Sequence, residues 1–257
     1  MKFDCAYITI HGTPGEDGKL QSYFDIIGLA YTSCDVLCSS LTFNKYFCNT
    51  YLKQKEISVA NSLMLRKQDK IDIKSIIETI GLPCFVKPNE GGSSFGISKV
   101  KTESELIPAI QKAFKESDQV IIEQFKKGRE ITSGLVKVNN KEYIFPLTEI
   151  KSPNEFFDYK AKYDDKKTKE ITPAEINEEL TKECKELSSK IYDYLNCKGL
   201  VRIDYILHEG KFNFLEINTS PGMSAASLVP QQVKEYGLSF TNLLSEIIEE
   251  AIEKARV

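Results

Sequence analysis

The sequence lacks any run of apolar residues long enough to span a lipid bilayer, and its first residues show no signal-peptide pattern. We therefore expect a cytoplasmic protein with no membrane partner. A dominant charge is also missing, because 34 basic residues nearly balance 37 acidic ones and leave a net charge of −3. Such a balance gives no overall basic field, so we expect no nucleic-acid partner.

Paired metal-binding and disulfide spacings are absent as well. The seven cysteines are scattered without a CxxC pair, and their odd number favours free, mostly buried thiols over disulfides or zinc. No Ser–His–Asp order indicates a nucleophilic triad. What is present is an ordinary globular composition over 257 residues, with 41% hydrophobic and 28% charged residues, enough for one large or two to three small domains.

The order of the predicted elements, hairpins alternating with helices, favours an α+β fold over a single parallel sheet. An apolar run at the N-terminus predicts a strand buried on both faces. The residues between 151 and 170 form no clear periodic pattern and predict a long lid or binding loop. Helices are expected over 19–27, 39–52, 71–80, 102–116, 173–195 and 240–255. Strands are expected over 3–10, 57–60, 83–88, 97–100, 120–125, 129–138, 141–146, 199–207 and 212–217, with an irregular segment over 223–230.

The last two predicted strands carry oxygen-bearing side chains. Glu216 and Asn218 alternate along one strand and leave it on the same face, as do Arg202 and Asp204 on the strand before it. A turn over 208–211 would bring the carboxylates and the amide together. Carboxylate and amide oxygens suit Mg²⁺. The alternative, an ordinary amphipathic hairpin with its polar face toward water, fits such apolar strands poorly.

A loop of small residues over 89–96 separates two further strands. Its backbone N–H groups could close over phosphates, although a surface hairpin loop explains the composition equally well. Lys87 lies just before this loop on an apolar strand, where a lysine without a partner would be costly. With Lys45 and Lys162 it could supply the cations that phosphoryl transfer needs around the transferred group.

Together these residues resemble the D-alanine–D-alanine ligases of the ATP-grasp superfamily. The resemblance implies two α+β subdomains that grip ATP, at 37–123 and 124–257, and a remnant of an N-terminal α/β domain at 1–36. The matching motifs run in family order over nearly the whole chain: HGTPGEDG (11–18), FNK (43–45), VKP (86–88), EGGSSFG (90–96), FDYKAKY (157–163), RID (202–204), EINTSPGM (216–223) and SLVP (227–230).

The resemblance implies a carboxylate–amine ligase that uses ATP to join two D-alanines through an acyl phosphate, for peptidoglycan precursor synthesis. It implies D-alanine and ATP as binding partners, two Mg²⁺ ions that Mn²⁺ could replace, and a homodimer for the full-length family. ATP would be bound by Lys45, Lys87, Ser93, Glu123, Glu130 and Lys162. The metal ions would be bound by Asp204, Glu216 and Asn218. Charge stabilisation, phosphate cover and acceptor choice would come from Arg202, Gly222, Ser93 and Tyr163. The two D-alanines would be bound by His11, Ser227 and Leu228.

The sequence also departs from the family pattern. Family members have an earlier segment with a glycine-rich turn and a glutamate that orients the first D-alanine. We therefore expect this chain to lack part of that site and much of the dimer interface. Asn44 and Ala226 stand where many members have Asp and His. Two alternatives stay open: a catalytically silent ATP-binding fragment, and a related ligase whose second substrate is D-lactate or D-serine.

Overall fold

We describe the protein from a computed structural model that covers residues 3–92, 95–151 and 168–255. Its helices are α1 (Lys19–Ile27), α2 (Val36–Phe43), α3 (Lys45–Gln54), α4 (Ile73–Ile80), α5 (Leu106–Ala113), α7 (Glu178–Tyr194), α8 (Leu228–Glu235) and α9 (Phe240–Ala255). Its strands are β1 (Cys5–Ala6), β2 (Ala30–Tyr31), β3 (Ser62–Arg66), β4 (Cys84–Pro88), β5 (Ser98–Val100), β6 (Gln119–Gln124), β7 (Arg129–Val138), β8 (Lys141–Ile144), β9 (Thr148–Lys151), β10 (Lys169–Ile171), β11 (Val201–His208) and β12 (Lys211–Asn218).

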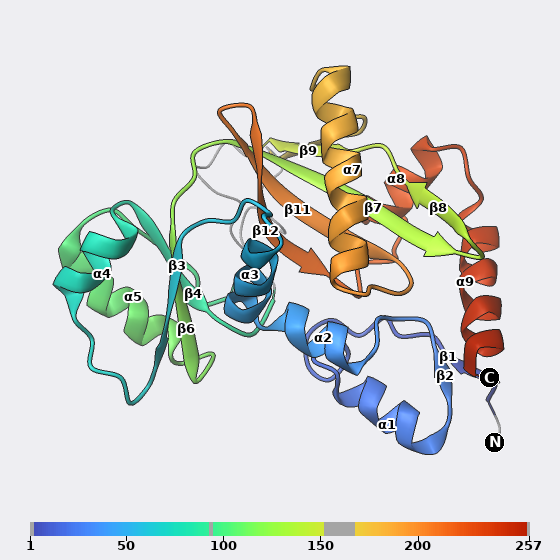
Figure 1. Cartoon of the computed structure of the whole chain (residues 1–257), viewed down its shortest axis with the longest axis horizontal. Coiled ribbons are helices and arrows are strands. Elements are labelled where there is room, and N and C mark those ends of the chain that lie inside the picture. Colours follow the sequence, from blue (N-terminus) through green and yellow to red (C-terminus); the bar gives the residue numbers. More distant parts are fainter. Residues whose placement is uncertain (1–2, 93–94, 152–167, 256–257) are drawn as a thin grey trace.

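An antiparallel sheet in the order β3-β6-β4-β5 forms one end of the molecule, with α4 and α5 packed on it (Figure 1). The helices bury Ile76, Ile80 and Ile110 against the strands. As the sequence predicts, α4 ends at Gly81, and the Thr102–Glu105 capping box precedes α5 through a short 3₁₀ turn. This end of the molecule therefore has its own apolar core.

A larger sheet in the order β10-β9-β7-β11-β12, with β8 beside β7, forms the middle of the molecule (Figure 1). Alternation along β7 divides its side chains between two cores. Ile131 and Leu135 pack in the cluster that includes side chains of α7, whereas Val136 and Val138 pack with side chains of α8 and α9. Because helices cover both faces of this sheet, a functional site is to be sought among the polar side chains at the ends of its strands.

The hairpin predicted between 129 and 146 is confirmed. Asn139 and Asn140 turn the chain with φ of 51° and 59°, the left-handed conformation that the favoured two-residue hairpin turn requires. The hairpin between β11 and β12 is also confirmed, and its register pairs Asp204 with Glu216 and Arg202 with Asn218. The sequence therefore predicted that the hairpin brings Asp204 close to Glu216, and the structure adds the register, which shifts between Asp204 and Tyr205.

The long N-terminal strand expected over 3–10 is wrong. Only β1 forms, paired in parallel with β2, while Phe3, Tyr7 and Ile10 are exposed. An apolar run becomes a strand buried on both faces only where neighbouring elements cover both of them. Here β2 pairs with just two residues of the run, and α9 packs against the pair.

The single helix expected over 39–52 is in fact two helices that break at Asn44. Asn44 ends α2, and its side-chain oxygen accepts a hydrogen bond from the Phe47 N–H at 3.1 Å to begin α3. Asparagine is among the best residues for starting a helix in this way. As a result, Lys45 is the first residue of α3 rather than a residue inside a longer helix.

Two further boundaries differ from expectation. The strand expected over 57–60 is reduced to one isolated bridge between Val59 and Phe214, and the regular strand β3 follows it. The segment expected to be irregular through Pro230 already turns helical at Leu228. Proline is tolerated in the first turn of a helix because the N–H it lacks would have no intrahelical partner there.

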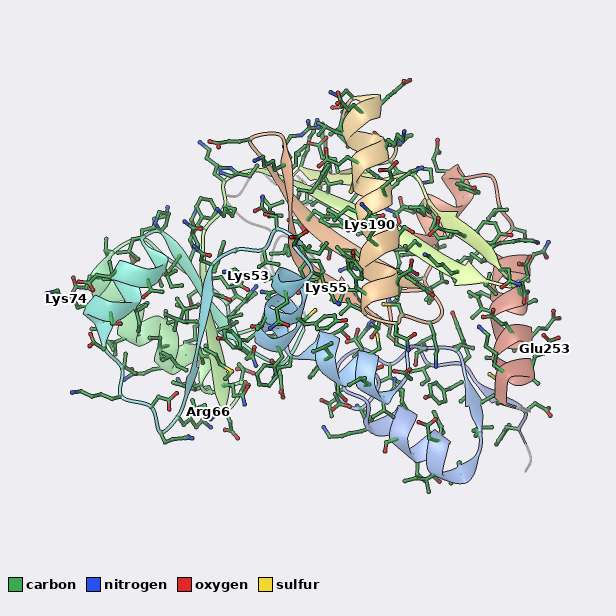
Figure 2. The ribbon with its side chains drawn as sticks, in the orientation of Figure 1. Lys53, Lys55, Arg66, Lys74, Lys190 and Glu253 are labelled. Atoms are coloured by element: carbon green, nitrogen blue, oxygen red, sulfur yellow. The ribbon has the colours of Figure 1, made fainter. Side chains whose placement is uncertain are left out.

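The charged residues that Figure 2 labels on α4, α7 and α9, which are Lys74, Lys190 and Glu253, are all exposed. Across the described residues, the helices are all too short or too polar to pass through a membrane. All seven cysteines are free thiols, and only Cys5 is not fully buried, which confirms the prediction of free, mostly buried thiols.

Candidate active site

Two cavities meet between the sheets. One, of about 520 Å³, lies beside the end of β12 and reaches His11, Glu16 and Ser227. The other, of about 710 Å³, lies between β4 and β6 on one side and the larger sheet on the other. Both are lined by Lys45, Glu130, Ile150 and Glu216. They are therefore adjacent compartments of one site, which we call the substrate cavity and the nucleotide cavity.

The polar ends of β11 and β12 form the wall between the compartments. Arg202 donates from Nη2 to Asp204 Oδ2 at 2.8 Å and from Nε to Oδ1 at 3.0 Å, and the Thr132 hydroxyl donates to the same Oδ1 at 2.7 Å. Asp204 lies opposite Glu216 in the sheet. The Asp204 carboxylate is thus buried and held in place by Arg202 and Thr132.

Arg202 stays charged in this setting. Burial alone would lower its pKa, but the neighbouring carboxylates of Asp204, Glu216 and Glu130 raise the pKa above the ordinary value for arginine. A permanently charged guanidinium, only 18% exposed, therefore lies on the wall of the substrate cavity. Such a group is suited to stabilise negative charge that develops on a bound substrate.

The donor set at this wall fits a hard divalent cation. Asp204, Glu216 and Asn218 offer two carboxylates and an amide oxygen, all of which line the substrate cavity. Asn218 Oδ1 accepts one hydrogen bond, from the Ser220 N–H at 2.9 Å, and an amide oxygen has a second lone pair. Oxygen ligands with room for water or phosphate are what Mg²⁺ requires.

Lys87 and Glu123 form a buried ion pair in the nucleotide cavity. Their side chains are 7% and 6% exposed, and the Lys87 Nζ to Glu123 Oε2 distance is 2.5 Å. Asn49 Nδ2 also donates to Glu123, at 2.9 Å. The structure thus supplies the partner that a lysine on an apolar strand needs.

Lys45 stands at the boundary of the two compartments because α3 begins there. Its Nζ donates to the Gly91 carbonyl at 2.8 Å, which links α3 to the small-residue loop. Burial lowers the pKa of Lys45, Glu216 opposes that shift, and Lys87 adds to it. The ammonium group is therefore poorly solvated, and an anionic ligand would stabilise its charged form.

Sequence reasoning missed Glu16 as a site residue, although it lies within the motif at 11–18. Its side chain lines the substrate cavity and accepts a hydrogen bond from the Gly12 N–H at 2.5 Å. Burial raises its pKa, while that backbone N–H and His11 lower it to a smaller extent. The signal available in the sequence was a carboxylate in the same glycine-rich motif as His11.

The far end of the substrate cavity is lined by His11, Gly222, Ser227 and Leu228. Ser227 is the first flanking residue of α8, yet its side chain makes no capping bond. Its hydroxyl lies 2.9 Å from that of Ser224. Because a hydroxyl has one donor and two acceptor sites, that one bond leaves Ser227 able to hydrogen-bond to a ligand as well. The structure therefore brings every described residue that the sequence singled out into one of the two compartments. Ser93, Lys162 and Tyr163 lie outside the described residues, so their roles stay predictions.

The comparisons with known proteins agree with this geometry. A family profile described as "D-ala D-ala ligase C-terminus" matches residues 51–249. The chain is 57% identical over 249 residues to a D-alanine–D-alanine ligase of Phocaeicola vulgatus, covering 96% of this chain and 76% of that protein. It is 53% identical over 248 residues to a D-alanine–D-alanine ligase of Bacteroides fragilis, again covering 96% and 76%.

Solved structures of ligases share the fold. The VanG D-Ala:D-Ser ligase of Enterococcus faecalis superposes with a TM-score of 0.89 at 34% identity, covering 98% of this chain and 74% of that one. The D-alanine–D-alanine ligase of Bacillus anthracis in complex with ATP superposes with a TM-score of 0.85 at 28% identity, covering 99% and 81%. The chain therefore has the ATP-grasp fold and belongs to the D-alanine–D-alanine ligase family.

Proposed function

We propose that this protein joins two D-alanines at the expense of ATP, for peptidoglycan precursor synthesis. The observation that carries the proposal is the shared wall of the two cavities, where Lys45 and Glu216 face both. A reaction that moves a phosphoryl group from ATP to an amino-acid carboxylate needs a nucleotide compartment and a substrate compartment that meet at cationic and metal-binding groups. The family membership supports the same conclusion.

On the nucleotide side, we propose that Lys45 and Lys87 contact the phosphates of ATP and that Glu130 and Glu123 hold the ribose and adenine. The depressed pKa of Lys45 supports its role, since phosphate would relieve a poorly solvated ammonium group. The ion pair between Lys87 and Glu123 holds the lysine at the cavity wall before ATP arrives. Ser93 and Lys162 complete the proposed phosphate contacts.

Asp204, Glu216 and Asn218 would hold the two Mg²⁺ ions, for which Mn²⁺ could substitute. The ions would neutralise the phosphate charge that accumulates during transfer. This chain's own contribution is to fix the oxygen donors by strand pairing, since Asp204 and Glu216 are opposite residues of β11 and β12. Hydrogen bonds from Arg202 and Thr132 keep Asp204 oriented.

The chemistry then divides one difficult condensation into two easier steps. A free carboxylate is a poor electrophile, so the first D-alanine carboxylate takes the γ-phosphoryl group, with ADP as the leaving group. The amine of the second D-alanine attacks the acyl phosphate, loses a proton, and displaces inorganic phosphate. Arg202 and the Gly222 N–H would stabilise the negative charge that develops on the reacting carbonyl.

We propose His11 as the contact of the first D-alanine, and Ser227 with Leu228 as the receptor for the carboxylate of the second. All three line the substrate cavity, which supports these roles. Tyr163 would favour an amine over D-lactate as the nucleophile. Because the reaction consumes ATP and supplies a precursor, we also propose a cytoplasmic location, and we retain the homodimer of the full-length family as a prediction.

The proposed division of the chain follows the two sheets. The smaller sheet, within 62–124, supports a central subdomain at 37–123, and the larger sheet, within 129–218, supports a C-terminal subdomain at 124–257. The separate cores of the two sheets favour the boundary between 123 and 124, although Cys38, Cys48 and Leu52 of α2 and α3 pack in the core of the larger sheet. The small β1–β2 pair supports a distinct N-terminal unit at 1–36.

An acceptor panel tests the proposal and separates it from a related ligase. The protein would be incubated with ATP, Mg²⁺ and D-alanine, alone or with an excess of D-serine or D-lactate, and the products would be identified by mass spectrometry. We expect D-alanyl-D-alanine as the main product in every mixture. The likeness to a D-Ala:D-Ser ligase makes D-alanyl-D-serine the informative alternative, and its dominance would overturn the assignment of the second substrate.

A further inference from the structure

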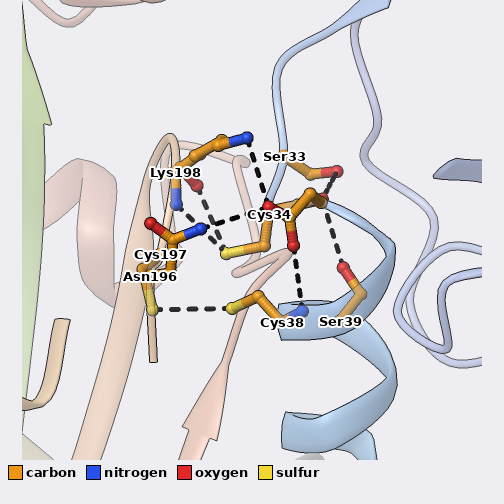
Figure 3. A network of polar contacts seen from close by, with 8 residues as sticks. Ser33, Cys34, Cys38, Ser39, Asn196, Cys197 and Lys198 are labelled. Carbon is orange, nitrogen blue, oxygen red and sulfur yellow. Dashed lines mark hydrogen bonds and ion pairs between the residues drawn. The ribbon is translucent and has the colours of Figure 1, made fainter. Parts of the chain in front are cut away.

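Three cysteine sulfurs lie together at the junction between the N-terminal segment and the larger sheet. The Sγ atoms of Cys34, Cys38 and Cys197 all lie within 4.8 Å of one another, and Cys38 Sγ is 3.8 Å from Cys197 Sγ (Figure 3). Cys34 precedes α2, Cys38 lies in its first turn, and Cys197 lies between α7 and β11. The proposed ligase reaction uses none of them, so the cluster calls for a separate explanation.

The backbone around the sulfurs is tied in place from both sides. The Lys198 N–H donates to Cys34 Sγ at 3.3 Å, and the Cys34 thiol donates to the Lys198 carbonyl at 3.4 Å. Asp35 accepts a hydrogen bond from Asn196 Nδ2 at 3.3 Å and pairs with Lys198 Nζ at 3.2 Å. Hydrogen bonds and an ion pair between residues 34–35 and 196–198 thus hold together the two segments that carry the sulfurs.

The thiolate, and not the thiol, is the form of cysteine that binds metals, so a metal that enters this cluster would displace thiol protons.

We propose that Cys34, Cys38 and Cys197 form a binding site for a soft monovalent cation of the Cu(I) class. Three sulfurs around one metal at about 2.3 Å lie about 4 Å apart, whereas a disulfide needs about 2.05 Å. The Cys38–Cys197 distance of 3.8 Å and the upper limit of 4.8 Å for the other pairs leave room for a metal between the three sulfurs. Among the first-row metals, thiolate ligands favour Cu(I) and Zn²⁺. Coordination by all three sulfurs as thiolates would release three protons and leave a net charge of −2 at the site.

The composition of the cluster argues against zinc. A structural zinc ion takes four ligands, and no other His, Cys, Asp or Glu of residues 3–92, 95–151 and 168–255 joins this group. Water is a poor candidate for the fourth position, because the three cysteines are only 0%, 1% and 7% exposed. Low coordination in a dry, sulfur-only pocket fits Cu(I) better than Zn²⁺.

The test is an anaerobic Cu(I) titration of the reduced full chain, with a chromophoric Cu(I) chelator as competitor. All proteins would carry Cys5→Ser, because Cys5 is the one thiol that is not fully buried. We expect one equivalent of Cu(I) to be withdrawn from the chelator. Each of three single substitutions should weaken Cu(I) binding by more than about 10-fold: Cys34→Ser, Cys38→Ser and Cys197→Ser. A loss of about 10-fold is already seen when a residue that only orients a metal ligand is removed, so loss of a ligand itself should cost more.

Cys184→Ser is the matched control. Cys184 is fully buried in the same apolar core but lies outside the group of three, so its loss should leave Cu(I) affinity unchanged. X-ray absorption of the Cys5→Ser protein with Cu(I) gives a readout that needs no substitution in the cluster, and we expect sulfur neighbours only. Nitrogen or oxygen neighbours, or Cu(I) affinity equal in the control and cluster variants, would overturn the proposal, as would tighter binding of Zn²⁺ than of Cu(I).

Discussion

Replacing Lys87 by methionine should destabilise the folded protein far more than the loss of an exposed lysine. The substitution leaves Glu123 as a buried carboxylate, 6% exposed, without its cation. Removing one partner of a buried ion pair typically costs about 3–5 kcal/mol. Asn49 still donates one hydrogen bond to Glu123, so we expect the lower end, about 3 kcal/mol.

Urea unfolding followed by circular dichroism measures this loss. At a slope of about 3 kcal/mol per molar urea, the midpoint should fall by about 1 M. Adding Glu123→Gln to Lys87→Met should restore most of the stability, because the uncompensated charge is then gone. A loss below about 1 kcal/mol in Lys87→Met would refute the reasoning, since that is the range of exposed pairs.

Lys67→Met provides the matched control. Lys67 pairs with Asp118 at the same distance of 2.5 Å, but the two side chains are 54% and 87% exposed. Water and salt screen that pair, so its loss should cost less than about 1 kcal/mol. Comparable losses in the two variants would mean that burial does not decide the strength of the Lys87 pair.

Three further predictions address the substrate cavity. Arg202→Met should lower kcat by about 10²–10³-fold in a steady-state phosphate-release assay, because it removes a group that stabilises charge in the transition state. An unchanged kcat would contradict that role. Burial raises the pKa of Glu16 above its ordinary value of 4.5. Above pH 4.5 the unfolded chain loses the Glu16 proton while the folded chain still holds it. The free energy of unfolding should therefore fall as the pH rises from 4.5 through the raised pKa. Glu16→Gln should abolish that fall in urea unfolding at a series of pH values. A Cβ on Gly222 would lie 2.6 Å from Ser227 Oγ, so Gly222→Ala should raise the KM of the second D-alanine by about 10- to 100-fold, and an unchanged KM would argue against Ser227 as its receptor.

Strand pairing and turns were the features that the sequence predicted best. The alternation of Arg202 with Asp204, and of Glu216 with Asn218, placed the polar side chains on one face of each strand, and the hairpin brings Asp204 opposite Glu216. The Asn139–Asn140 turn selects its hairpin because both residues tolerate a positive φ. These signals are local, so a single sequence carries them.

The misses have local and tertiary causes. The break at Asn44 has a local cause in its side-chain bond to Phe47, which begins α3, and a tertiary contact of Lys45 with Gly91 adds to it. The apolar run over 3–10 carries no information on how far β2 pairs with it. The three-sulfur cluster joins residues about 160 positions apart, and only the spacing of Cys34 and Cys38 could have hinted at it.

The central claim is that the two compartments act together in one ATP-driven ligation. Phosphate release from ATP with Mg²⁺, measured on this 257-residue chain with and without D-alanine, tests it most directly. We predict release that requires D-alanine and saturates with its concentration, accompanied by D-alanyl-D-alanine. ATP binding without any D-alanine-dependent release of phosphate would contradict the account.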